Sequence, residues 1–242
     1  MSALPFDPLP VITTHSEALY DAAESRLDLP AASCPGWTVA DLVAHLTGVH
    51  WFWATIVEDL LAEPPPAHPA RVPDDQLIEA GRAQAGRQVR VLAADDPSAS
   101  CWTWAPTQKD AGFVVRHQVQ EAAVHHWDAA DATGTPWAID PVVAADCVDE
   151  FLTFSVASEH YPADVQLGGT FCLQAADTGG SWAITDGLAP GTLGVTRGTT
   201  DGPALRASAP ELLLWLYRRA EIDAGEVPAE LLQRFRAMSS TD

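Results

Sequence analysis

The stretch from Phe113 to Asp128 constrains the fold of this chain more than any other. It is predicted to be helical, and within it Glu121 and His125 lie four residues apart. At that spacing the two side chains leave the same face of a helix, about one turn from each other. A carboxylate oxygen and an imidazole nitrogen are both common metal ligands, so the pair is a candidate part of a metal site. A third ligand would then come from a facing helix, which is how helix bundles build such sites.

His45 is the candidate third ligand. It lies in a second predicted helix, over residues 38–60, whose apolar stripe consists of Leu42, Leu46, Val49 and Trp53. Each part also has an ordinary explanation. A Glu and a His at this spacing often form only a hydrogen-bonded pair, and a core histidine is commonly satisfied by its neighbours. The residues alone therefore leave open whether the site holds a metal.

Two segments of the chain resemble a known family. They are CPGWTVADLVAHL at 34–46 and QEAAVHHWDA at 120–129. Both resemble the mycothiol-dependent maleylpyruvate isomerase family of actinobacteria, whose N-terminal part is a DinB-like metal-binding four-helix bundle. The resemblance implies that His45, Glu121 and His125 hold a divalent metal, usually zinc.

The resemblance extends over nearly the whole chain. The segment APELLLWLYRR at 209–219 resembles the closing helix of the family, and Arg219 matches its closing arginine. This match implies a contact with a substrate carboxylate, whereas the alternative is a solvated arginine at a helix C-terminus. One departure is Gln120, where many relatives carry a histidine. This position lies about 100° round the helix from Glu121, so we expect the metal site to be spared and substrate contacts to differ.

The resemblance implies chemistry with a thiol cosubstrate. Two histidines and one carboxylate give zinc three protein ligands and leave a position open, as in catalytic sites. A metal deprotonates a bound thiol, whose free pKa is about 8.5, and so produces a nucleophile without a protein cysteine. In the family the thiol is mycothiol. The metal-bound thiolate then either transfers its sulfur to an electrophile or supports cis–trans isomerisation of the maleylpyruvate type. The chain is therefore expected to be a mycothiol-dependent S-transferase or isomerase.

Three alternatives remain open on this ligand set. Non-haem iron also uses two histidines and a carboxylate. A non-catalytic regulatory module could use the same bundle to sense a metal or a thiol. A zinc hydrolase would place water on the metal, with Asp128, two turns beyond Glu121, as a candidate general base.

The composition excludes two classes of partner. The 242-residue chain has 33 acidic and 13 basic residues and a formal net charge of −20. This balance disfavours nucleic acid and anionic membranes, since phosphate binding requires clustered basic side chains. No signal pattern and no apolar run near ~18 residues is present, which predicts a cytoplasmic protein without a membrane span. The partners expected are a small-molecule thiol and an electrophilic substrate, for a monomer or homodimer. Four widely spaced cysteines are expected to be reduced thiols: Cys34, Cys101, Cys147 and Cys172.

The hydrophobic pattern predicts an α+β chain of two domains. Helices are expected from Thr13 to near Leu29 and over 38–60, 74–94 and 113–133. After Pro136 a helix is followed by short β-rich runs, and a further helix is expected from Leu212 to Ala220. The runs lie at 170–175, 181–185, 192–196 and 204–207. We therefore expect a DinB-like four-helix bundle over 1–136 and a small α+β domain over 137–242 that helps to form the substrate pocket.

Overall fold

The computed structural model describes residues 4–239. The chain forms two compact units, and each is described by itself. The first contains Met1–Trp104 and Gln108–Ala138, and the second contains Ala105–Thr107 and Ile139–Asp242.

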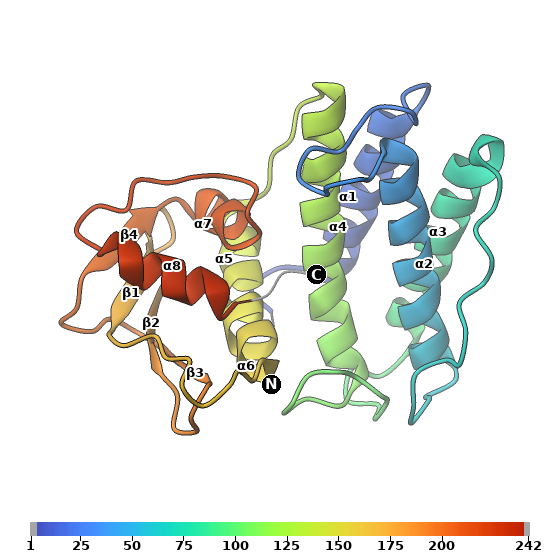
Figure 1. Ribbon diagram of the computed structural model, residues 1–242. Helices are drawn as coiled ribbons and strands as arrows, with labels where there is room; N and C mark the ends of the chain where they lie inside the picture. Colours follow the sequence, from blue (N-terminus) through green and yellow to red (C-terminus); the bar gives the residue numbers. More distant parts are fainter. Residues whose placement is uncertain (1–3, 240–242) are drawn as a thin grey trace. The chain divides into compact units, whose positions relative to one another are not determined.

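The first unit is a four-helix bundle (Figure 1). Each helix packs mainly against two others, in the cyclic order α1, α4, α2, α3. Leu42 and Leu46, two members of the predicted apolar stripe, are fully buried in its core. The predicted helix bundle is thus confirmed. Its helices are α1 (Pro8–Ala23), α2 (Val39–Glu58), α3 (Leu77–Ala94), which follows the 3-10 turn η1 (Asp74–Gln76), and α4 (Ala111–Thr133).

Side-chain caps set the ends of the two helices that carry the candidate ligands. At the start of α2, Thr38 and Asp41 form a capping box, in which each side chain accepts from the backbone N–H of the other residue. At the start of α4, the Asp110 side chain accepts from a first-turn N–H at 3.0 Å. Helix α4 ends at Gly134, whose φ of 69° lies in the left-handed region that glycine adopts without strain. The candidate ligands therefore lie on helices with well-defined ends.

Helix α1 begins earlier than predicted. It starts at Pro8, with Asp7 as its cap, and the Asp7 side chain accepts from the N–H of Leu9 at 3.2 Å. The predicted start at Thr13 is wrong because Pro8 and Pro10 fall in the first helical turn. A proline is tolerated there, since its missing N–H would have had no partner within the helix.

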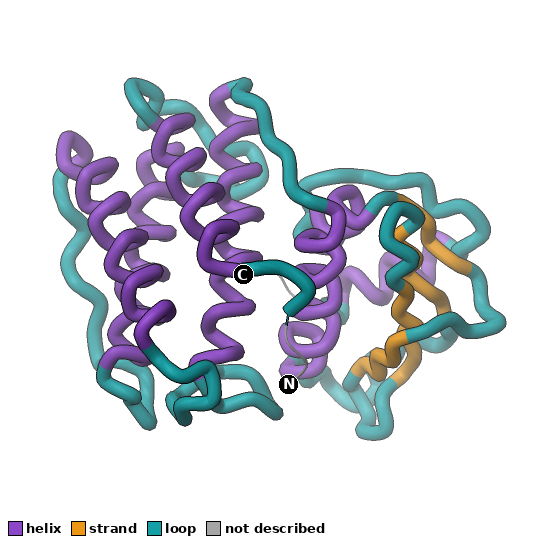
Figure 2. Tube along the Cα trace, turned by 180° about the vertical axis from the view of Figure 1, so that it is seen from behind, coloured by secondary structure: helices purple, strands orange, loops and turns teal. Residues whose placement is uncertain are grey.

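The second unit combines helices with a four-stranded sheet (Figure 2). The strand order is β3-β2-β1-β4, with antiparallel pairing throughout except between β1 and β4, which are parallel. Leu173 of β1 is paired with Trp182 and with Leu205, and all three side chains are buried. The predicted α+β fold class, with a small sheet in the C-terminal part of the chain, is confirmed. Its elements are α5 (Pro141–Glu150), the π-helical turn η2 (Phe151–Ser155), α6 (Val156–Ser158), β1 (Phe171–Ala175), β2 (Ser181–Asp186), β3 (Leu193–Arg197), β4 (Ala204–Ala207), α7 (Ala209–Leu216) and α8 (Ala229–Ala237).

Two helices of the second unit differ from the prediction. Helix α7 ends at Leu216 and does not continue to Ala220, because the chain leaves helical geometry at Arg218, where φ is 66°. Helix α8 was not predicted. Its buried residues Leu231 and Phe235 lie four positions apart, which is the helical spacing that could have identified it.

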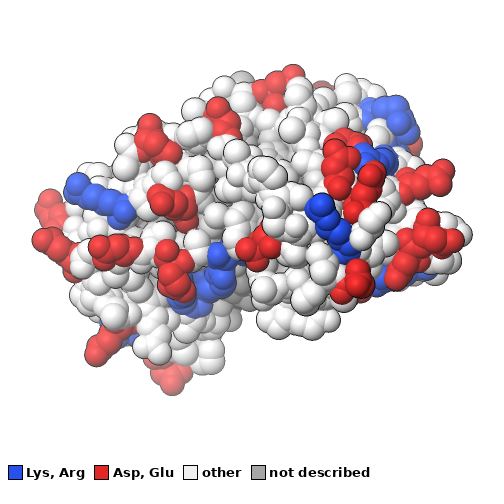
Figure 3. Space-filling model, turned by 90° about the horizontal axis from the view of Figure 1, so that it is seen from above, with Lys and Arg blue, Asp and Glu red and all other residues white. Residues whose placement is uncertain are grey.

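Surface charge is mainly negative, as the composition requires. On the face shown in Figure 3 the basic side chains lie among acidic ones. Arg82, for example, contacts the carboxylates of Glu17, Asp21 and Glu24. None of the helices within residues 4–239 has the length and apolarity needed to cross a membrane.

A buried histidine makes the bundle sensitive to acid. His50 is fully buried, and its ring nitrogens lie 3.4 Å from the hydroxyls of Ser16 and Tyr20. Burial lowers the pKa of His50 to about 3, because the charged form loses its hydration. In the unfolded chain the same group titrates near 6.5. Below that pH the unfolded state takes up a proton that the folded state excludes, so stability falls as the pH falls.

We expect His50→Gln to reduce this acid sensitivity. At pH 5 the wild-type protein should lose about 2 kcal/mol of unfolding free energy at this residue relative to pH 7, and the variant should lose correspondingly less. The measurement is urea unfolding of chelator-treated protein at both pH values, followed by the helical circular dichroism signal. The exposed His160, changed to Gln, serves as control. Equal pH dependence in all three proteins would contradict the assignment.

Candidate functional site

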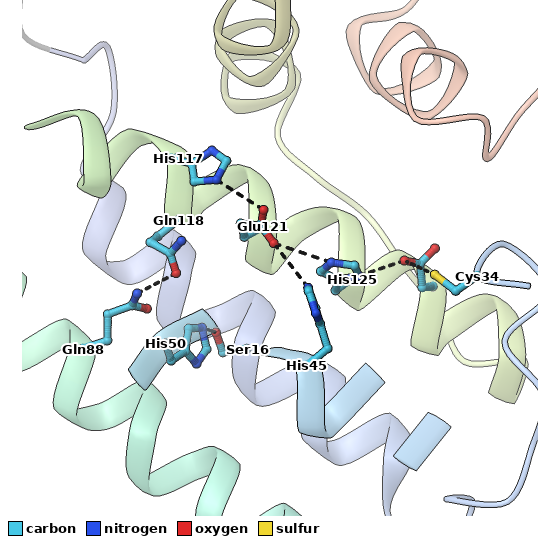
Figure 4. Close-up of polar contacts among 10 residues, drawn as sticks. Ser16, Cys34, His45, His50, Gln88, His117, Gln118, Glu121 and His125 are labelled. Carbon is cyan, nitrogen blue, oxygen red and sulfur yellow. Dashed lines mark hydrogen bonds and ion pairs between the residues drawn. The ribbon is translucent and has the colours of Figure 1, made fainter. Parts of the chain in front are cut away.

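The three predicted ligand residues converge in the first unit (Figure 4). His45 comes from α2, and Glu121 and His125 come from α4, with their side chains pointing toward one another. Glu121 Oε2 lies 3.5 Å from His125 Nε2 and 3.9 Å from His45 Nε2. The two histidine rings meet edge to face, with centroids 4.7 Å apart. One potential ligand atom from each residue thus lies within 4.8 Å of the other two.

This donor set has the chemistry and spacing of a small metal site. Two ligands held about 2.1 Å from a tetrahedral zinc lie about 3.4 Å from each other. The separations between Glu121 Oε2 and the two imidazole nitrogens are close to that value. The exposed fractions of the side chains are 35% for His45, 23% for Glu121 and 11% for His125. The site is therefore most accessible to solvent at His45.

A fourth group, His117, lies beside Glu121. Its Nε2 is 3.3 Å from Glu121 Oε1, the oxygen that does not face the candidate ligands. The ring of His117 stacks on Phe113 and contacts Trp53 and Trp104. The spacing of four residues that singles out His125 also holds between His117 and Glu121, so the sequence contained a signal for this contact.

The histidines control the charge of Glu121. Burial raises the pKa of this carboxyl, but hydrogen bonds from His117, His125 and His45 outweigh burial and hold the pKa well below its usual range. For His125, burial lowers the pKa, whereas hydrogen bonds to Asp128 and Glu121 raise it to about 9. Without a metal, the two residues thus form an ion pair. A metal ion would have to displace a proton from His125 on binding.

Asp128 lies behind His125 and is fully buried. One of its oxygens, Oδ2, is 3.0 Å from His125 Nδ1, the ring nitrogen on the far side from Glu121. The sulfur of Cys34 is 3.6 Å from the same oxygen. Cys34 is half-buried, Cys101, Cys147 and Cys172 are buried, and all four are thiols rather than disulfides.

Arg219 belongs to the second unit and lies beyond the end of α7, whereas it was predicted within this helix. The helix closes with two backbone bonds, from the N–H of Arg219 to Leu214 and from the N–H of Arg218 to Trp215. Arg218 occupies the left-handed position where glycine is usual. The guanidinium of Arg219 donates to the carbonyl of Tyr217 at 2.7 Å and lies over its ring. The substrate contact of Arg219 stays a prediction.

Comparison with known proteins points to one family. Residues 11–130 match the family model described as the mycothiol maleylpyruvate isomerase N-terminal domain. The chain is similar to a crystal structure of the mycothiol-dependent maleylpyruvate isomerase, with a TM-score of 0.60 at 12% identity, over 91% of this chain and 93% of that chain. A histidine-to-alanine mutant of that isomerase gives a TM-score of 0.55 at 11% identity, over 86% of each chain. At such low identity the structural similarity establishes the fold alone. The comparison with curated proteins finds no match.

Proposed function

Because the chain belongs to the mycothiol maleylpyruvate isomerase family through its N-terminal domain, we propose that it is a metal-dependent enzyme with a low-molecular-weight thiol cosubstrate. The thiol is mycothiol, and the reaction is a cis–trans isomerisation of the maleylpyruvate type. The observation that carries the proposal is the convergence of His45, Glu121 and His125 on one partly exposed point.

His45, Glu121 and His125 would hold a divalent metal, and zinc suits two imidazole nitrogens with one carboxylate oxygen. When bound, the metal would supply a Lewis acid that stabilises the thiolate form of the cosubstrate. Glu121 would balance part of the positive charge. His117 holds the other oxygen of Glu121, so that Oε2 stays turned toward the two histidine ligands. No protein cysteine is needed as nucleophile in this scheme.

Substrate contacts are proposed for two further groups. Gln120 is 1% exposed, and its amide atoms have no hydrogen-bond partner among the described residues, which leaves them available to a ligand. Arg219 would bind the carboxylate of an anionic substrate, as its match to the closing arginine of the family implies. The second domain, over 137–242, would in this way help to form the pocket and orient the electrophile.

The metal can be tested directly. Protein purified without chelator should contain about one divalent ion per chain by elemental analysis, as a site with three ligands implies. His45→Ala and His125→Ala should lower the content well below one, because each removes a ligand. His160→Ala, at an exposed position, should leave it unchanged. Full occupancy in both ligand variants would show that the convergence is an ion-paired cluster and not a metal site.

The reaction can be followed by the ultraviolet absorbance of maleylpyruvate with and without mycothiol. We expect turnover only with the thiol, and turnover near background in His125→Ala. Cys34→Ser should retain most of the wild-type rate, because the nucleophile comes from the cosubstrate. Loss of turnover in Cys34→Ser with metal retained would overturn this scheme.

The same assay separates the alternatives. An isomerase regenerates its thiol, whereas an S-transferase consumes thiol when a Michael acceptor or a bimane is supplied. Turnover without any thiol would indicate a hydrolase, for which the buried Asp128 is poorly placed to activate water. Binding of thiol or metal without turnover would indicate a sensing module.

Arg219→Ala should weaken the apparent affinity for an anionic substrate by roughly ten- to a hundredfold, the usual worth of a hydrogen bond to a charged group. Metal content should not change. Steady-state KM and kcat for maleylpyruvate, measured beside Arg206→Ala at an exposed position of β4, provide the test. An unchanged KM in Arg219→Ala would remove this residue from the substrate site.

A further inference from the structure

The carboxylate of Asp128 accepts hydrogen bonds from its own helix α4 and from the turn that precedes α2. Asp128 is 0% exposed. Oδ2 accepts from His125 Nδ1 at 3.0 Å and from the thiol of Cys34 at 3.6 Å. Oδ1 accepts from the hydroxyl of Ser33 at 2.7 Å. A fully buried carboxylate of this kind is costly unless donors surround it, so these contacts hold the side chain in one position.

The contact with His125 decides which ring nitrogen faces Glu121. An ionised carboxylate can only accept hydrogen bonds, so Nδ1 of His125 keeps its hydrogen. The other nitrogen, Nε2, is the atom 3.5 Å from Glu121 Oε2. It is therefore the nitrogen whose lone pair can point at a metal. A carboxylate behind a histidine ligand commonly fixes both the tautomer and the orientation of the ring in this way.

The contact with Ser33 and Cys34 connects Asp128 to the other candidate ligand. Three backbone hydrogen bonds close the turn that contains Ser33. The N–H of Ala31 donates to the Trp37 carbonyl at 2.9 Å, the N–H of Cys34 to the Ala31 carbonyl at 3.1 Å, and the N–H of Trp37 to the Cys34 carbonyl at 2.9 Å. At the end of this turn, the centroid of the Trp37 ring lies 5.1 Å from the centroid of the His45 ring. One buried carboxylate thus holds His125 directly and supports His45 through the turn.

We propose that Asp128 is a positioning residue that holds His125 and the turn 33–37 in the arrangement that binds the metal. This inference rests on the proposed function only in taking His45 and His125 as ligands. It assigns to Asp128 a role apart from that of general base, and it gives the segment before α2 a function in the site.

Asp128→Asn is the sharpest variant, because it keeps the size of the side chain. If the amide oxygen keeps the bond from Ser33, the amide NH2 replaces Oδ2 and presents a donor to His125 Nδ1. This favours the opposite tautomer, with hydrogen on Nε2 toward the metal position. Metal affinity should then fall roughly 10- to 100-fold, as is typical when the group behind a histidine ligand is lost. Ser33→Ala removes only the hydrogen bond from the turn to Asp128 Oδ1, so its effect on metal affinity should be smaller.

Affinity is measured by competition between each protein and a chromophoric zinc chelator, with the helical circular dichroism signal as a check of folding. Asp131→Asn lies on the same helix at an exposed position and should bind zinc as the wild type does. In zinc-loaded wild-type protein, nitrogen-15 NMR should show His125 with hydrogen on Nδ1. This signal should be lost or shifted in Asp128→Asn.

Three results would overturn the proposal, and they are distinguishable. Unchanged zinc affinity in a folded Asp128→Asn protein would remove the role of Asp128 and leave the proposed function intact. Failure of the wild-type protein to bind zinc would remove both. A thiolate-to-cobalt charge-transfer band in cobalt-loaded wild-type protein, absent from Cys34→Ser, would show that Cys34 is itself a ligand. The metal would then lie in the alternative group of Cys34, His125 and Asp128, whose potential ligand atoms also lie within 4.8 Å of one another, and Asp128 would not act from behind His125.

Discussion

The candidate site depends on how the charge of one half-buried carboxylate, that of Glu121, is compensated. Glu121 lies inside a helix bundle, where an ionised carboxylate is costly unless positive charge or hydrogen-bond donors surround it. Three histidines do so, at 3.3, 3.5 and 3.9 Å. Two of them come from the same helix, one turn before and one turn after, so α4 alone places them. The third comes from α2, and its contact requires that the two helices pack in one register. Packing of the apolar core supplies that register, and the caps fix where each of the two helices begins.

Local rules predicted a large part of this arrangement. The spacing of Glu121 and His125 is a property of one helix, and the capping box at Thr38 is a property of four consecutive residues. Neither depends on the rest of the chain. The choice of His45 came from resemblance to a family, because no spacing rule connects residues on different helices. The structure then brought these three side chains together.

The features that were missed depend on contacts or backbone geometry that the local pattern does not show. Ser33 and Asp128 are 95 positions apart, and their hydrogen bond exists only because the turn before α2 packs on α4. The end of α7 was misplaced because Arg218 adopts the left-handed geometry that the sequence would suggest only for glycine or asparagine. This geometry is compensated by the Arg218 guanidinium, which donates to the carbonyls of Leu216, Arg236 and Ser239. Arg236 and Ser239 lie in or after the helix α8 that the prediction lacked.

A cluster of histidines around a glutamate could also be a purely structural ion-paired core, and two features favour a metal instead. A structural cluster is most stable when it is closed to water, yet the His45 side chain is 35% exposed and forms the longest of the three contacts with Glu121. An exposed ion pair of this kind contributes little to stability. His125, in contrast, is held from behind by a fully buried carboxylate, an expensive arrangement if its only purpose is another ion pair. Rigid support behind one ligand, together with an open approach beside another, is the arrangement that a metal site with an exchangeable position requires.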